Sequence, residues 1–300
     1  MRNARSLWLM WKQCLLVLCA LGITSVAVAK PDPATSLRDK YALLGQQLQH
    51  NPFGRPLVVE STDADNRLTG EIYAIVDYPF SEVSAGLNSP EHWCDVISLH
   101  TNTKYCRAAS GAGGSMLRVH IGKKTAEELA SVPRLDFDYH VAAAAPEYFD
   151  ILLSARDGPM GTSDYRIGLE AVALPNARTF LHLTYSYAFN FAGRLAMQTY
   201  LGTIARDKVG FTATGRSNGG QPEYVGGVRA LAERNAMRYY LAIDAFLEAA
   251  HTVPAAQFER RLQSWFNATE RYPRQLHDLA WAEYAEMKRA ENLRQQVVKN

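Results

Sequence analysis

Alternating apolar and polar positions dominate the middle of the chain. The pattern is clearest over residues 135–141, 147–153, 165–171 and 181–189, and weaker at 57–60, 70–77, 104–109 and 116–121. Side chains along a strand point to opposite faces with a period of two, so each range predicts a strand with one buried face. The links between most of them are short and contain turn residues, as in Gly111–Gly114 and Asp157–Pro159. These links predict an antiparallel meander.

Helical periodicity replaces this alternation elsewhere. Two short helices are predicted at 79–87 and 89–97, the second opened by Ser89 as N-cap and Pro90 in the first turn. Residues 39–49 predict a short helix, and 191–207 another, followed by a last strand at 209–214. A long helix is predicted from Tyr224 to Ala250, and two more over 254–272 and 274–297.

The N-terminus has the layout of a secretory signal peptide. Arg2, Arg5 and Lys12 precede an uncharged stretch that ends in the small-residue pattern Ala27-Val28-Ala29. We expect cleavage near Lys30 and a periplasmic or secreted mature protein; the alternative is an uncleaved membrane anchor. Loss of these three bases from a chain with 32 basic and 30 acidic residues leaves one net negative charge. This balance predicts no nucleic-acid partner.

Two cysteines, Cys94 and Cys106, remain in the expected mature chain. An even pair in an oxidising compartment predicts a disulfide. The alternatives are a metal pair or a reactive thiol, but no Cys-x-x-Cys pattern or clustered histidine accompanies either cysteine. We therefore expect the disulfide, and neither a metal nor a cofactor.

The order of these elements resembles the helix-grip fold of the START-like (SRPBCC) superfamily. The resemblance covers roughly residues 57–250, and its local anchors are the stretches Asp77–Val83 and Ser89–Cys94. It implies an α+β fold in which a curved antiparallel sheet wraps around a long C-terminal helix, here with extra C-terminal helices. The implied domains are a signal peptide (1–29), a leader (30–56), the ligand-binding domain (57–250) and a helical extension (251–300).

The resemblance also implies a function, namely binding of a hydrophobic small molecule or lipid in an internal cavity. Aromatic residues that share strand faces or lie on the second short helix are the expected ligand-binding residues: Trp93, Phe137, Tyr139, Phe149, Tyr185, Tyr187 and Phe189. The alternative is that they fill an ordinary core. Arg194, Arg206 and Lys208 flank one predicted helix, where they could contact anionic head groups of a membrane transiently; the alternative, a solvated helix face, is favoured.

Chemistry is only weakly indicated. His140, Glu170 and His182 lie on the polar faces of different strands, where solvent-facing positions are favoured over an acid–base or metal set. No His-Glu-x-x-His motif occurs in the sequence. Two other functions stay open: an enzyme of the cyclase or hydrolase type on the same fold, and an envelope structural protein that binds a partner through its C-terminal helices.

Overall fold

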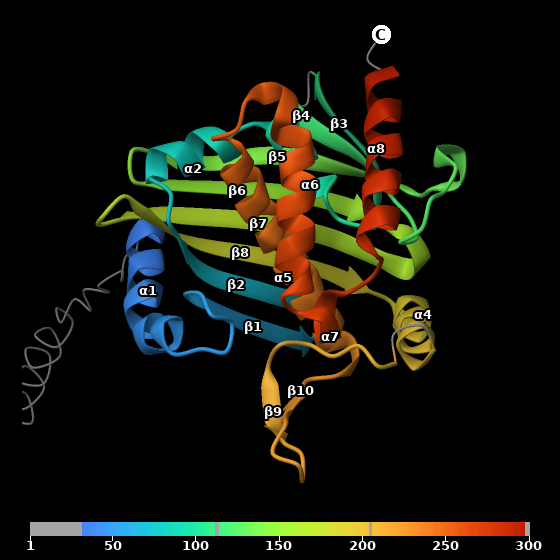
Figure 1. The fold of residues 1–300 in the computed structure, drawn as a ribbon, viewed down its shortest axis with the longest axis horizontal. Helices are drawn as coiled ribbons and strands as arrows, with labels where there is room; N and C mark the ends of the chain where they lie inside the picture. Colours follow the sequence, from blue (N-terminus) through green and yellow to red (C-terminus); the bar gives the residue numbers. More distant parts are fainter. Residues whose placement is uncertain (1–31, 112–113, 204–205, 298–300) are drawn as a thin grey trace, which may run out of the picture. The chain divides into compact units, whose positions relative to one another are not determined.

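The computed structural model describes residues 32–111, 114–203 and 206–297, so the predicted signal peptide lies outside the described residues. An eight-stranded antiparallel sheet forms the centre of the fold, in the order β1-β2-β8-β7-β6-β5-β4-β3 (Figure 1). Its strands are β1 (Leu57–Ala64), β2 (Arg67–Val76), β3 (Thr103–Gly111), β4 (Gly114–Ile121), β5 (Arg134–Ala145), β6 (Tyr148–Asp157), β7 (Thr162–Leu174) and β8 (Arg178–Phe189). The predicted meander is confirmed from β3 to β8.

Tight turns and one long-range pairing set the order of the strands. Asp65 and Asn66 both have positive φ in the two-residue turn between β1 and β2, the conformation of a type I′ hairpin. Strand β2 then pairs with β8, more than a hundred residues later. Between β2 and β3, the helices α2 (Phe80–Leu87) and α3 (Pro90–Ile97) carry the chain from one edge region of the sheet to the other edge. The side chain of Ser89 caps α3, as predicted.

The long helix α5 (Gly227–Ala249) lies across one face of the sheet (Figure 1). Its buried residues join Ile72 and Ala74 of β2 in the main hydrophobic core. Gly70 allows a close approach, because a Cβ atom there would lie 2.6 Å from the carbonyl oxygen of Ala232. A curved antiparallel sheet around a long helix confirms the predicted α+β helix-grip fold.

The other face of the sheet carries a smaller core beneath α1 (Pro33–Gln49). Leu37, Leu44 and Leu48 of this helix pack against Tyr73 and Phe180. Sequence periodicity predicted only 39–49, so the helix begins six residues earlier than expected. The leader is therefore folded onto the sheet and has its own apolar contacts.

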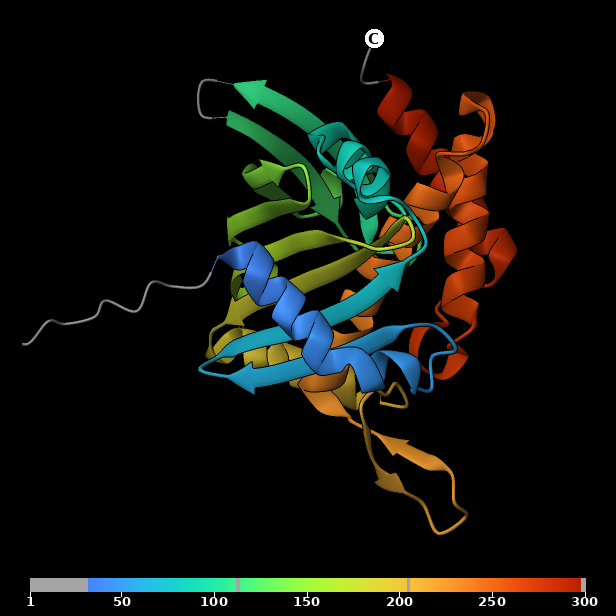
Figure 2. The same cartoon turned by 90° about the vertical axis from the view of Figure 1, so that its left-hand side faces the viewer.

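The remaining elements lie around α5. Helix α4 (Phe191–Gly202) follows β8, and a separate hairpin of β9 (Ala213–Arg216) and β10 (Pro222–Tyr224) precedes α5. The expected strand at 209–214 is wrong in extent, because only its end enters this small hairpin. The C-terminal helices α6 (Pro254–Glu270), α7 (Pro273–Leu276) and α8 (Trp281–Val297) gather beside α5 (Figure 2). Residues 277–280 interrupt the single helix expected over 274–297. In the described ranges, no helix has the length and apolar character needed to cross a bilayer.

Candidate functional site

The aromatic residues expected to bind a ligand lie in the main core. Trp93, Phe137, Phe149, Tyr185, Tyr187 and Phe189 are buried, and Tyr139 is partly buried against them. The ring of Tyr187 stacks on that of Tyr165, with the centroids 5.1 Å apart, and its hydroxyl lies 3.3 Å from the sulfur of Met197. The ring of Tyr185 lies 5.4 Å from that of Tyr239 on α5. The structure thus brings the residues of β8 together with α5, and their role toward a ligand stays a prediction.

The predicted disulfide is confirmed. Cys94 on α3 is bonded to Cys106 on β3, with the Cα atoms 5.2 Å apart. Both residues are buried. The bond ties the second short helix to the edge strand of the sheet, and these two elements form one side of the hollow described next.

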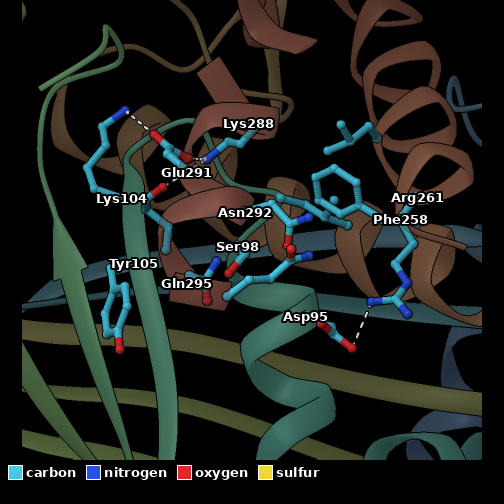
Figure 3. A pocket seen from close by; sticks show the side chains of 14 residues that line it. Asp95, Ser98, Lys104, Tyr105, Phe258, Arg261, Lys288, Glu291, Asn292 and Gln295 are labelled. Atoms are coloured by element: carbon cyan, nitrogen blue, oxygen red, sulfur yellow. Dashed lines mark hydrogen bonds and ion pairs between the residues drawn. The ribbon is translucent and has the colours of Figure 1, made fainter. Parts of the chain in front are cut away.

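A hollow of about 140 Å³ lies where α6 and α8 meet α3 and β3 (Figure 3). One part of its wall is apolar, and the rest is polar or charged. The apolar residues are Leu99, Tyr105, Phe258 and Leu262, and the polar and charged ones are Asp95, Ser98, Thr103, Lys104, Arg261, Lys288, Glu291, Asn292, Gln295 and Gln296. A cavity of about 150 Å³ accommodates one benzene ring. The hollow therefore has room for one ring-sized group of a ligand.

Two lysines and one glutamate are buried along this wall (Figure 3). Lys288 Nζ donates to the carbonyl oxygens of His100 and Thr103, at 2.7 and 2.8 Å, and lies 2.8 Å from Glu291 Oε2. Lys104 Nζ donates to the carbonyl oxygen of Thr101, at 2.9 Å, and lies 3.2 Å from Glu291 Oε1. Only 1, 2 and 6% of the Lys104, Lys288 and Glu291 side chains is exposed. These contacts fix α8 on the loop before β3.

The charges of this cluster do not cancel, since two ammonium groups share one carboxylate. Burial lowers the pKa of Lys288 to about 8, and the nearby Glu291 carboxylate opposes this shift. Burial also lowers the pKa of Lys104. Both directions are those expected when an ammonium group loses water without full compensation. The hollow is thus lined on this side by partly compensated positive charge.

An ion pair crosses the other side of the hollow. Arg261 Nη1 on α6 lies 2.7 Å from Asp95 Oδ2 on α3, and the guanidinium lies over the ring of Phe246, 5.0 Å from its centroid. This pair holds α6 against α3. Together with the disulfide and the Lys288 contacts, it fixes the hollow from three sides, which is the preorganisation that a binding site requires.

Two of the three residues tested for acid–base chemistry meet on the face of the sheet that α1 covers. His182 Nδ1 lies 3.1 Å from Glu170 Oε2, and Nε2 lies 2.9 Å from Glu71 Oε1. The imidazole stacks on Tyr73, with the ring centroids 4.3 Å apart. His140 is exposed and stands outside this cluster. Glu71 was missed by sequence reasoning, because its neighbour β8 is distant in the chain.

The electrostatics of this cluster favour a charged imidazole. Burial opposes the charge on His182, but the hydrogen bonds with Glu170 and Glu71 outweigh it, so its pKa is raised. The hydrogen bond with His182 lowers the pKa of Glu71 and of Glu170. The cluster faces away from α5 and the main core. Within residues 32–111, 114–203 and 206–297, no group of three His, Cys, Asp or Glu residues is placed to hold a metal ion.

Stability is expected to depend on pH through this cluster. Because the pKa of His182 is raised in the folded state, protonated His182 stabilises the fold. This stabilisation is fully present below about pH 6.5, the pKa of the unfolded chain, and is lost as the pH rises through the pKa of the folded state. The lowered pKa values of Glu71 and Glu170 stabilise it above about 4.3, with loss as pH falls. We expect His182→Gln to reduce stability most between about pH 4.5 and 6.5. Urea unfolding of the wild type and variant from acid to alkaline pH measures this difference.

His140→Gln is the matched control, because His140 lies on the same face but is exposed and outside the cluster. Its pH–stability curve should follow that of the wild type. If the curves of His182→Gln and the wild type have the same shape, the cluster does not contribute as described.

Comparison with known proteins gives similarity to solved structures only. No family model matches the chain, and no curated protein matches its sequence. An aromatase/cyclase, Zhui, from Streptomyces sp. R1128 is 14% identical, with 71% of this chain and 99% of that chain covered and a TM-score of 0.34. A START superfamily protein from Mycobacterium smegmatis is 15% identical, with 46% and 92% covered and a TM-score of 0.31. Human StAR-related lipid transfer protein 5 is 10% identical, with 58% and 89% covered and a TM-score of 0.31.

Identities and scores this low support no inference about ligand or activity. The fold assignment depends instead on the sheet order β1-β2-β8-β7-β6-β5-β4-β3 and on the long helix across it. This chain therefore has a helix-grip fold, extended by α1 on the opposite face of the sheet and by three C-terminal helices.

Proposed function

We propose that the protein is an exported binding domain for a small amphipathic molecule, which binds in the hollow between α3, β3, α6 and α8. The observation that carries the proposal is the composition of this hollow. It combines the apolar side chains of Leu99, Phe258 and Leu262 with the buried Lys104–Glu291–Lys288 cluster. A ligand pocket typically has such an apolar wall with a few fixed polar groups.

The chemistry of the walls limits the ligand. An aliphatic or aromatic group the size of one ring would contact the apolar side. An acceptor or anionic group would face Ser98, Asn292 and Gln295, near the net positive charge of the two lysines. A longer apolar chain would have to extend beyond the hollow. We therefore propose a compact amphipathic molecule or the end of a lipid.

The inward aromatic face is a second proposed binding region, retained from the sequence. Tyr185 on β8 and Tyr239 on α5 are 8 and 6% exposed, although their rings meet where α5 covers the sheet. Neither residue lines the hollow between α3, β3, α6 and α8. A ligand there would displace side chains that now contact each other.

The enzyme alternative receives less support from the geometry. His182 and Glu170 meet, but on the face of the sheet beneath α1 and away from the hollow. The buried lysines at the hollow each contact several acceptors and hold α8 in place. A binding role accounts for these contacts without a reacting group.

Filling the hollow is expected to weaken ligand binding. Asn292→Trp would place an indole among the lining residues without removing a buried apolar group, so we expect ligand affinity to fall by about tenfold or more. Lipid and small-molecule extraction of the purified protein, followed by mass spectrometry, identifies the ligand. Calorimetric titration of that ligand then measures the affinity of each variant.

Leu293→Trp is the matched control, because Leu293 is the next residue of α8 and is 62% exposed. It should bind the ligand as the wild type does. Equal affinity in Asn292→Trp and the wild type would exclude the hollow as the binding site. Recovery of no small molecule, together with capture of the C-terminal helices by another envelope protein, would favour the partner-binding alternative.

A further inference from the structure

A second cluster of charged residues lies on the far side of the segment 100–104, which leads into β3, where α5 meets the connection between α7 and α8. Arg238 Nη2 on α5 lies 2.8 Å from Asp278 Oδ2, and Lys124 Nζ, just after β4, lies 2.5 Å from Asp278 Oδ1. Only 2 and 4% of the Arg238 and Asp278 side chains is exposed. One carboxylate thus contacts two cations, which it cannot both neutralise.

Two further cations lie close enough to act on this cluster. Arg234, one turn before Arg238 on α5, is buried and donates to the carbonyl oxygen of Val209, at 3.4 Å. Lys208 donates to the carbonyl oxygen of His277, the neighbour of Asp278. Positive charge therefore reaches Asp278 from α5, from the segment before β9 and from the segment after β4. The helices α5 and α7 lie against each other in Figure 1.

The ionisable groups respond to this excess of positive charge. Burial lowers the pKa of Lys124 to about 8, and the charges of Arg238 and Arg234 contribute to the shift. Burial also lowers the pKa of His100, with Arg238 contributing next. Arg238 and Lys124 outweigh the opposing effect of burial on Asp278, so its pKa is about 2. Buried positive charge that is not matched by an acid is costly for a fold.

A hydrogen-bond donor at the centre of the cluster is also unused. The Nε–H of Arg238 is buried and has no acceptor among the described residues. A buried donor of this kind usually donates a hydrogen bond to the protein or to ordered water. Without such a partner, it is free to donate to an acceptor atom of a ligand. Charged donors of arginine and lysine match the oxygens of carboxylate and phosphate groups.

We propose that Lys124, Arg234, Arg238 and Lys208 form an anion-binding site for a single carboxylate or phosphate group. An oxygen atom of the bound anion would accept a hydrogen bond from the Nε–H of Arg238. The negative charge of the anion would offset the positive charge that Asp278 does not neutralise. This site is separate from the hollow between α3, β3, α6 and α8, because the segment 100–104 lies between them. In this segment, the Thr101 hydroxyl contacts Asp278, whereas Lys104 faces the hollow.

The experiment compares two neighbouring lysines in the full mature chain. The Lys124 side chain is 29% exposed and contacts Asp278, whereas the Lys123 side chain is 81% exposed and lies near Glu127. Inorganic phosphate, octanoate and the neutral octanol are titrated calorimetrically at constant ionic strength. We expect Lys124→Gln to weaken binding of the anions by about tenfold, as for loss of a charged hydrogen bond, and Lys123→Gln to leave it unchanged.

The three probes separate the sources of the anion. Binding of both phosphate and octanoate supports a site for free ions, and binding of octanoate alone supports a site for the head group of an amphiphile. Octanol, which carries no charge, should not bind at this site in either case. Lys208→Gln gives a second variant, which removes another positive charge of the site, and it should weaken binding in the same direction.

Two results would overturn the site. One is the absence of saturable binding of phosphate and of octanoate to the wild type at millimolar concentrations. The other is an equal loss of affinity in Lys123→Gln and Lys124→Gln, which would indicate nonspecific attraction. Asn292→Trp should bind inorganic phosphate normally, and octanoate binding that is lost in Asn292→Trp but kept in Lys124→Gln belongs to the hollow, so failure of the hollow as a site and failure of this site are distinguished.

Discussion

Replacing Glu291 with glutamine is expected to lower the free energy of unfolding by about 3–5 kcal/mol. Glu291 supplies the carboxylate between the ammonium groups of Lys104 and Lys288, and all three side chains are buried. Glutamine keeps the size of the side chain but removes the negative charge, so the two lysines would face each other uncompensated. Urea unfolding followed by circular dichroism measures the loss. Since α8 is held by these contacts, its amide protons should also exchange faster.

Glu286→Gln provides the control on the same helix, because Glu286 is exposed. Its stability should stay within about 0.5 kcal/mol of the wild type. If both variants unfold at the same urea concentration, the buried ion pairs contribute little and α8 is held by its apolar contacts alone.

Replacing Tyr187 with alanine is expected to lower the free energy of unfolding by about 3–5 kcal/mol, as for other large rings removed from a packed core. The ring stacks on Tyr165 and its hydroxyl contacts Met197 of α4. Ser186→Ala, on the opposite face of the same strand, should cost about 1 kcal/mol or less. Thermal melting and binding of a fluorescent lipid probe are measured on the same samples.

The combination of these two measurements decides what the aromatic face does. A large loss of stability with unchanged probe binding would assign Tyr187 to the packed core. A small loss of stability with weakened probe binding would instead establish the inward aromatic face as a ligand site. In that case the hollow beside α8 would be a secondary feature.

Local patterns in the sequence predicted most of the secondary structure. Strands β3 to β8 alternate regularly and are joined by short turns, so each strand could be found from its own residues. The pairing of β2 with β8 joins strands that are distant in the chain and has no local signal, so it was not predicted. The interruption between α7 and α8 was missed because apolar residues of a helical period continue on both sides of it.

The candidate sites show the same division between local and distant contacts. Glu170 and His182 are directly opposite in the β7–β8 hairpin, so their meeting follows from the turn at Asn176 and Ala177. By contrast, Lys104 lies 187 positions before Glu291, and the charged end of α8 resembles a solvated tail in sequence. Tyr284 and Met287 of α8 are buried on the same side of the helix as Lys288. Their spacing was the only indication in the sequence that this side of α8 is buried.

The pairing of β2 with β8 also determines how the chain can fold. The eight-stranded sheet is complete only after β2, which ends at Val76, pairs with β8, which begins at Arg178. The entropy of closing so long a loop must be lost before the contacts of α5 with β1 and β2 can form, and pairings this distant are associated with slow folding. The meander from β3 to β8 can assemble from neighbouring strands. The β1–β2 hairpin is also local, but it can join the sheet only once β8 is in place, and α1 packs on the completed face. The N-terminal part of the domain is thus expected to be the last to acquire its native structure.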